Sequence, residues 1–176
     1  MEHAEAILIQ THALSDTSLI AVWCTESHGI VRTAARGARR PKSAFHGKID
    51  LFFSGEISWV MGKSDLHPLR ELQISNYREG LRRSYLTTLM ASYFAKLIER
   101  FIEPGQPVPE IHDLLHRALT HLEKTEPSRK ALIHFEREFA RIEGCYRPGH
   151  QPAHLIENQF GPLPPLRQQV LDRLPE

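Results

Sequence analysis

The stretch that decides the fold is SLIAVWCTESHGIVRTAA, residues 18–35. It holds two apolar runs, residues 18–24 and 29–35, which enclose the polar, glycine-ended turn at residues 25–29. Two β-rich runs joined in this way predict a β-hairpin. We expect further strands on either side of it, at residues 6–11, 49–53, 56–61 and 65–75.

After residue 75 the apolar residues recur at helical spacing. The first series predicts a long amphipathic helix and consists of Leu81, Tyr85, Leu89, Tyr93, Leu97 and Phe101. Asn76 and Glu79 resemble a capping box at its start, and Pro104-Gly105 ends it. We expect further helices at residues 109–122, 127–143 and 163–174, and a loop rich in Pro, Gly and His at residues 145–162.

Strands followed by helices predict an α+β protein of two packed units rather than an alternating α/β sheet. We place the boundary so that residues 1–75 form the β domain and residues 76–176 the helical domain. The chain has 176 residues, of which 41% are apolar, and this is enough to form a real core.

Cysteine content and hydropathy bear on the compartment. Cys24 and Cys145 lie far apart in the sequence and form no CxxC pair, which favours a reducing compartment over a disulfide scaffold. The first residues lack the basic and apolar regions of a signal peptide, and no apolar run approaches the roughly 20 residues that span a bilayer. The sequence therefore predicts a soluble cytoplasmic protein with no membrane partner.

The formal net charge is only +1, but the charge is unevenly distributed. The basic segment, residues 29–49, has no Asp or Glu and carries six cations: Arg32, Arg36, Arg39, Arg40, Lys42 and Lys48. Clustered guanidinium groups match phosphate oxygens, and an interleaved aromatic ring, here Phe45, offers a surface on which a base stacks. We therefore expect a nucleic-acid-binding surface. A solvated face without a ligand and a protein-facing patch are the alternatives.

Three more cations open the first expected helix, directly after the last expected strand. Because this position lies just past the β domain, we expect them to extend the path of the nucleic acid; they are Arg78, Arg82 and Arg83.

Four motifs, in this order and spacing, resemble the RecO family of recombination mediators. They are SDTSLI at residues 15–20, TESHG at residues 25–29, ARGARRPKS at residues 35–43 and IDLF at residues 49–52. The resemblance covers residues 6–75 and implies a five-stranded OB-fold barrel followed by an α-helical bundle. OB-folds bind oligonucleotides on the face of strands 2 and 3 and on nearby loops, and the basic segment lies in that region.

The resemblance also implies a function. Such a protein binds single- and double-stranded DNA and anneals strands in the recombinational repair of gaps. Its implied partners are a RecR-type protein and the C-terminal tail of single-stranded-DNA-binding protein, and it is nucleoid-associated when bound to DNA. The alternative is a protein-interaction module with a RecR-like partner and little DNA affinity of its own. RNA binding through the same surface is a third hypothesis, because phosphate contacts do not distinguish RNA from DNA.

Besides Leu51, which replaces a proline of the family in IDLF, the chain departs from the family pattern in two places. Many members carry a four-cysteine zinc module after the third helix, whereas residues 145–161 contain one cysteine. The basic residues common before the Phe-Glu pair of the third helix are replaced here by Ile133 and His134. Docking of the acidic tail would then need other cations, such as Arg129, Lys130 and Arg137.

No catalytic, metal or cofactor site is expected. The sequence contains no P-loop, nucleophile elbow or G-x-G-x-x-G motif, so we predict no enzymatic activity. His112 and His116 are four residues apart, and Cys145, His150 and His154 form a C-x₄-H-x₃-H pattern. Structural zinc usually takes four ligands from tighter pairs. We therefore favour surface histidines without a metal for the first group, and for the second group the vestige of a zinc site is the alternative.

Overall fold

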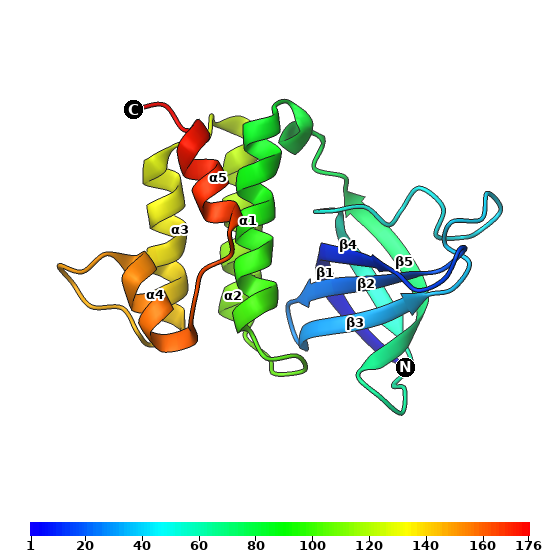
Figure 1. Ribbon diagram of the computed structural model, residues 1–176. Coiled ribbons are helices and arrows are strands. Elements are labelled where there is room, and N and C mark those ends of the chain that lie inside the picture. The colour runs from blue at the N-terminus through cyan, green and yellow to red at the C-terminus, as the bar shows by residue number, and fades with distance from the viewer. The chain divides into compact units, whose positions relative to one another are not determined.

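The computed structural model describes all of residues 1–176 and divides into two compact units (Figure 1). The first unit contains Met1–Arg78 together with Ile102–His112, and the second contains Glu79–Phe101 together with Asp113–Glu176. The expected boundary after residue 75 lies close to the first crossing between the units. The return of residues 102–112 to the first unit was not foreseen from the sequence.

The first unit is built on five strands that form a closed barrel: β1 (Glu2–Ala13), β2 (Leu19–Thr25), β3 (Gly29–Ala35), β4 (Ser54–Trp59) and β5 (Leu66–Asn76). The order around the barrel is β1-β2-β3-β5-β4. Only β3 and β5 pair in parallel, and the other neighbours are antiparallel. This is the expected OB-fold architecture, and the hairpin at residues 18–35 forms β2 and β3.

The alternation of side chains along the strands fills the barrel. Trp23 and Ala21 of β2 and Val31 of β3 belong to its buried cluster, together with Trp59 of β4. The indole Nε1–H of Trp23 donates to the Thr33 hydroxyl at 2.9 Å, so this buried polar atom is satisfied inside the barrel. The core thereby fixes which face of β2 and β3 points outward.

One expected strand is absent. Residues 49–53 form a turn rather than a strand, because Phe52 adopts a left-handed backbone with φ +71°. The turn is attached to the middle of β1, where Phe52 N–H donates to the Leu8 carbonyl at 2.8 Å and Leu8 N–H donates to the Phe53 carbonyl at 3.0 Å. Both phenylalanine rings are buried, so apolar residues that indicated a strand serve as an anchor for the loop before β4.

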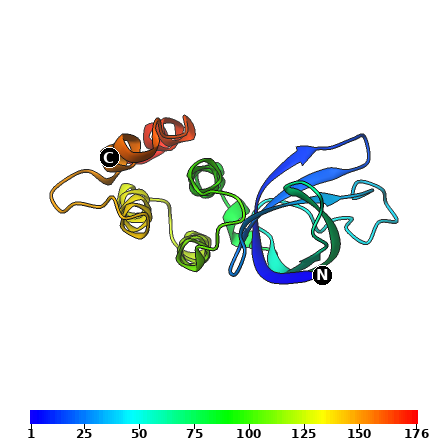
Figure 2. The same cartoon turned by 90° about the horizontal axis from the view of Figure 1, so that it is seen from below.

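The second unit is helical. It contains the 3₁₀ turn η1 (Glu79–Arg82) and α1 (Tyr85–Phe101), most of α2 (Pro109–Lys124), and α3 (Arg129–Ile142), α4 (Pro152–Phe160) and α5 (Leu166–Arg173). Figure 2 looks down α1, α2 and α3, whose axes run nearly parallel. Phe94 of α1 stacks on Phe135 of α3 with ring centroids 3.9 Å apart, and both rings are buried. None of the helices combines the length and the apolar content that crossing a bilayer requires.

Two helix predictions need correction. The first helix begins at Tyr85 and not near Asn76, which ends β5 and whose side chain accepts a hydrogen bond from Arg78 N–H at 2.8 Å. Ser84 takes the capping role, because its hydroxyl accepts from Thr87 N–H at 3.1 Å. The expected loop at residues 145–162 contains α4, which starts with Pro152 in its first turn, where a missing N–H costs nothing.

Candidate functional sites

The loop between β3 and β4, residues 36–53, carries most of the basic segment. Successive tight turns order it, with Arg40 N–H donating to the Gly37 carbonyl at 2.9 Å and Ser43 N–H donating to the Arg40 carbonyl at 3.0 Å. The β1–β2 loop holds its first residues, because Arg39 N–H donates to the Thr17 carbonyl and Gly37 N–H to the Ser18 hydroxyl, both at 3.0 Å. The backbone of the β3–β4 loop is therefore fixed at the end of the barrel where β3 ends.

The side chains of four cations in this loop are exposed and form no ion pair: Arg36, Arg39, Arg40 and Lys42. The two flanking cations differ from them. Arg32, on the outside of β3, forms an ion pair with Asp65 of the β4–β5 loop at 3.3 Å, and Lys48 is half-buried. Four charges without a protein partner on an ordered loop produce a local positive potential that attracts polyanions.

Phe45 does not have the exposed position expected of a stacking residue. It is half-buried and packs against the hydrophobic cluster inside the barrel, together with Ile49. Its hydrophobic area stabilises the fold of the loop by covering the barrel end. We therefore correct its expected role from base stacking to loop packing.

The outer face of β2 and β3 is also not the open binding face that was expected. The outward side chains Val22, Cys24 and Ile30 are each 4% exposed or less. Part of the cover comes from the returning segment of the same unit, where Gly105 N–H donates to the Ile30 carbonyl at 3.0 Å. Burial raises the pKa of the Cys24 thiol to about 12. The exposed cations consequently lie on the loop beyond β3 and not on the strand face.

The three cations after β5 have different surroundings. Arg78 is 2% exposed, and its Nε–H donates to the Ser54 hydroxyl at 2.9 Å, so it is a buried side chain and not a phosphate contact. Arg83 donates to the Glu123 carbonyl at 2.7 Å and to the Thr125 carbonyl, and it forms an ion pair with Glu126. It therefore ties the start of α1 to the end of α2. Arg82 is exposed on η1.

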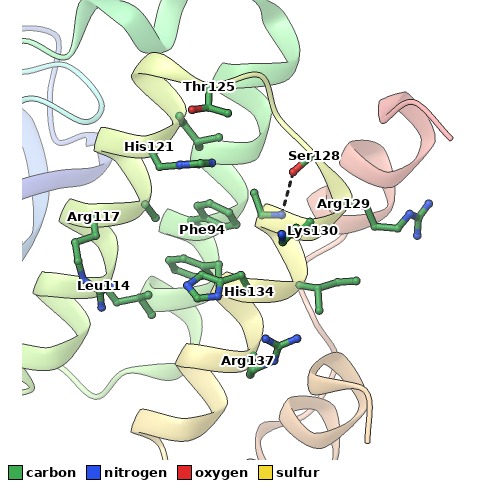
Figure 3. Close-up of a pocket in the computed structure, with 15 residues that line it drawn as sticks. Phe94, Leu114, Arg117, His121, Thr125, Ser128, Arg129, Lys130, His134 and Arg137 are labelled. Atoms are coloured by element: carbon green, nitrogen blue, oxygen red, sulfur yellow. Dashed lines mark hydrogen bonds between the residues drawn. The ribbon is translucent and has the colours of Figure 1, made fainter. Parts of the chain in front are cut away.

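A second candidate site is the groove between α2 and α3, a cavity of about 900 Å³ whose residues all belong to the helical unit (Figure 3). Its apolar lining includes Phe94, Leu114 and Phe135. Figure 3 shows basic side chains from both helices along it, Arg117 and His121 from α2 and Lys130, His134 and Arg137 from α3.

The groove brings together the three cations that the sequence offered as substitutes, Arg129, Lys130 and Arg137, around the Ile133-His134 pair. Arg117 was not foreseen, although it lies four residues before His121 beside the apolar stripe of α2 and this spacing could have indicated it. Its Nε–H donates to Asp113 at 2.8 Å, so the unpaired positive charge of the groove comes mainly from α3.

Behind the groove, Glu136 of α3 is fully buried. Its carboxylate accepts hydrogen bonds from the Tyr93 hydroxyl and from Nε of Arg167, both at 2.6 Å. Burial and the adjacent negative charge of Glu136 raise the pKa of Tyr93 above its usual range, so this hydroxyl stays protonated and donates. The three residues join α1, α3 and α5 and fix the side of α3 that faces away from the groove.

No group of three or more His, Cys, Asp or Glu side chains gathers in a way that could hold a metal ion. Neither the His112–His116 pair nor the set of Cys145, His150 and His154 forms part of such a group.

Comparison with known families accounts for both units. Residues 1–78 match the model of the family described as "Recombination protein O N terminal", and residues 82–147 match "Recombination protein O C terminal". The chain belongs to the RecO family. The two matches cover the barrel with the β3–β4 loop and the helices that form the groove, so both candidate sites lie within the parts shared with RecO proteins.

Individual relatives agree with this assignment. The chain is 29% identical to the DNA repair protein RecO of Syntrophus aciditrophicus over 82% of its own length and 56% of the relative. It is 30% identical to the DNA repair protein RecO of Bacillus subtilis over 70% of its length and 48% of the relative, and 30% identical to that of Burkholderia pseudomallei over 79% and 50%. The chain thus spans about half the length of the curated relatives it matches.

Proposed function

We propose that this RecO-family chain binds single- and double-stranded DNA through the β3–β4 loop and anneals complementary strands in the recombinational repair of gaps, in the bacterial cytoplasm. The observation that carries the proposal is the set of exposed, unpaired cations Arg36, Arg39, Arg40 and Lys42 on a loop with a fixed backbone. Phosphates that replace counterions at such a surface give sequence-independent affinity. The relatives are named DNA repair proteins, which also supports a function on DNA.

The test is fluorescence anisotropy of a labelled single strand of 30 nucleotides at several salt concentrations. We expect R36A/R39A/R40A to weaken binding regardless of base sequence. The slope of log affinity against log salt should flatten by about 2 to 3, because each lost phosphate contact removes about 0.7 to 0.9. Strand annealing, followed with a complementary pair, should slow in parallel.

A matched control removes three exposed cations from the helical unit, K124A/R147A/R173A, and should leave the slope close to that of the parent chain. An unchanged slope in R36A/R39A/R40A would contradict the assignment of the loop. Capture of a RecR-type protein by a chain that binds no DNA would instead support the alternative function, a protein-interaction module. Competition with RNA of the same sequence tests the third hypothesis.

A second candidate function is specific to the α2–α3 groove. We propose that it docks the acidic C-terminal tail of single-stranded-DNA-binding protein. An apolar floor flanked by cations suits a peptide that combines apolar side chains with carboxylates. In this chain Arg129, Lys130 and Arg137 supply the charge that Ile133 and His134 do not.

Titration of a labelled synthetic tail peptide tests the groove. We expect K130A and R137A each to weaken binding by about fivefold, the upper range for a partly exposed ion pair. R141A is the control, because Arg141 lies on the same helix but pairs with Glu138 at 2.7 Å and does not line the groove. Equal affinities for all three variants and the parent chain would reject this docking site.

A further inference from the structure

An exposed tyrosine lies at the same end of the barrel as the β3–β4 loop. At this end β1 and β3 finish, β2 and β4 begin, and β5 finishes at Asn76. Tyr77 follows immediately and is 45% exposed. It is the only exposed Phe, Tyr or Trp side chain among residues 1–78, since the two tryptophans and Phe52 and Phe53 are buried and Phe45 is half-buried.

The backbone around Tyr77 is held in one conformation. The Asn76 side chain accepts from Arg78 N–H at 2.8 Å, which closes a turn around Tyr77. Arg78 has a left-handed backbone with φ +47° and is kept there by its buried side chain, which donates to Ser54. A non-glycine residue in this region is strained and persists only where its surroundings impose it.

The ring of Tyr77 is fixed on one side and open on the other. Its edge-to-face contact with the buried ring of Phe53 has centroids 4.9 Å apart. Phe53 is the last residue of the β3–β4 loop, so the tyrosine sits on the anchored end of the loop that carries the cations. An aromatic face that is already ordered loses little conformational entropy when it binds a flat partner.

We propose that Tyr77 is the stacking platform for an unpaired nucleobase of a strand whose phosphates contact the β3–β4 loop. The inference rests on the proposed DNA binding and adds to it a preference for single strands. Stacking needs a free base face, which a duplex does not offer, whereas the loop cations contact phosphates in either form. Tyr77 thus takes the role that the sequence had indicated for Phe45.

The experiment compares Y77A, Y77F and the parent chain on a labelled 30-nucleotide thymidine strand and on a duplex of the same length. We expect Y77A to weaken single-strand binding by about 5- to 150-fold, the range for loss of one stacked base. Y77F, which keeps the ring, should bind within about twofold of the parent. The salt slope should be unchanged in Y77A, because no phosphate contact is removed. Duplex affinity should also stay constant.

A matched control is Y85A, which removes an exposed tyrosine from the helical unit and should bind like the parent chain. If Y77A lowers thermal stability, the parent chain itself supplies the test: ultraviolet crosslinking to a strand containing 5-iodouracil should label Tyr77. Unaltered single-strand binding by Y77A, equal weakening on both DNA forms, or crosslinks only elsewhere would overturn the platform. Absence of DNA binding by the parent chain would instead overturn the proposed function as well.

Discussion

Glu136 is the only buried acidic residue of the helical unit. Its carboxylate has no contact with solvent, and Arg167 supplies the balancing charge with Nε at 2.6 Å and a second guanidinium nitrogen at 3.2 Å. A buried ion pair gains little over an apolar pair, but removal of one partner leaves an uncompensated charge. Arg167 therefore holds α5 against α3, because its loss would leave the Glu136 charge buried without compensation, even though the pair itself adds little net stability.

We expect R167M to lower the free energy of unfolding by about 3 to 5 kcal/mol, because the Glu136 charge then keeps only the Tyr93 hydroxyl. The double variant E136Q/R167M should be more stable than R167M alone, since the amide still accepts from Tyr93 and carries no charge. Urea unfolding followed by circular dichroism measures both. The single variant E136Q completes the cycle, and a loss in the double variant equal to the sum of the losses in E136Q and R167M would show that the two side chains are not coupled.

At the scale of elements, the sequence predicts those strands and helices whose apolar residues follow a regular spacing. The β2–β3 hairpin and the helices α1, α2 and α3 carry apolar residues on one face or along one run, and their cores were predictable from the sequence. The prediction of a strand at residues 49–53 was wrong, because Phe52 and Phe53 are buried by a left-handed turn at Phe52 and not by strand pairing. Helix α4 was not predictable from the composition of residues 145–162, because Pro, Gly and His are typical of loops, although proline is also favoured in the first turn of a helix.

The features of the candidate sites likewise divide into those that the sequence shows and those that depend on tertiary packing. The cations of the β3–β4 loop could be predicted, because a cluster of charge without acids is visible in the sequence. The burial of Phe45 and Arg78 and the exposure of Tyr77 could not, since each depends on tertiary packing at the barrel end. Arg83 likewise meets carbonyl groups 40 or more residues away, which no local pattern records.

At the scale of the whole molecule, the barrel unit is discontinuous in sequence. Residues 102–112 return to it, and they pack so closely that a Cβ atom added at Gly29 would overlap the Gln106 carbonyl oxygen. The outer side of β2 and β3 is as apolar as an interior, with Val22 and Cys24 each 2% exposed and Ile30 4% exposed. A barrel without the returning segment therefore exposes a contiguous apolar face to water, which favours self-association.

The reactivity of Cys24 reports on this cover. In a C145S background, the full chain should react slowly with an aromatic disulfide reagent at pH 8, because the remaining thiol is buried and its pKa is about 12. A fragment ending at Arg78 lacks residues 102–112 and should react at least about tenfold faster, and it should sediment as a larger species as its concentration rises. The full chain in guanidinium gives the fully exposed rate. A fragment that stays monomeric and protects Cys24 as well as the full chain would show that residues 1–78 bury their own outer face, and that the return of the chain to the barrel is dispensable for its stability.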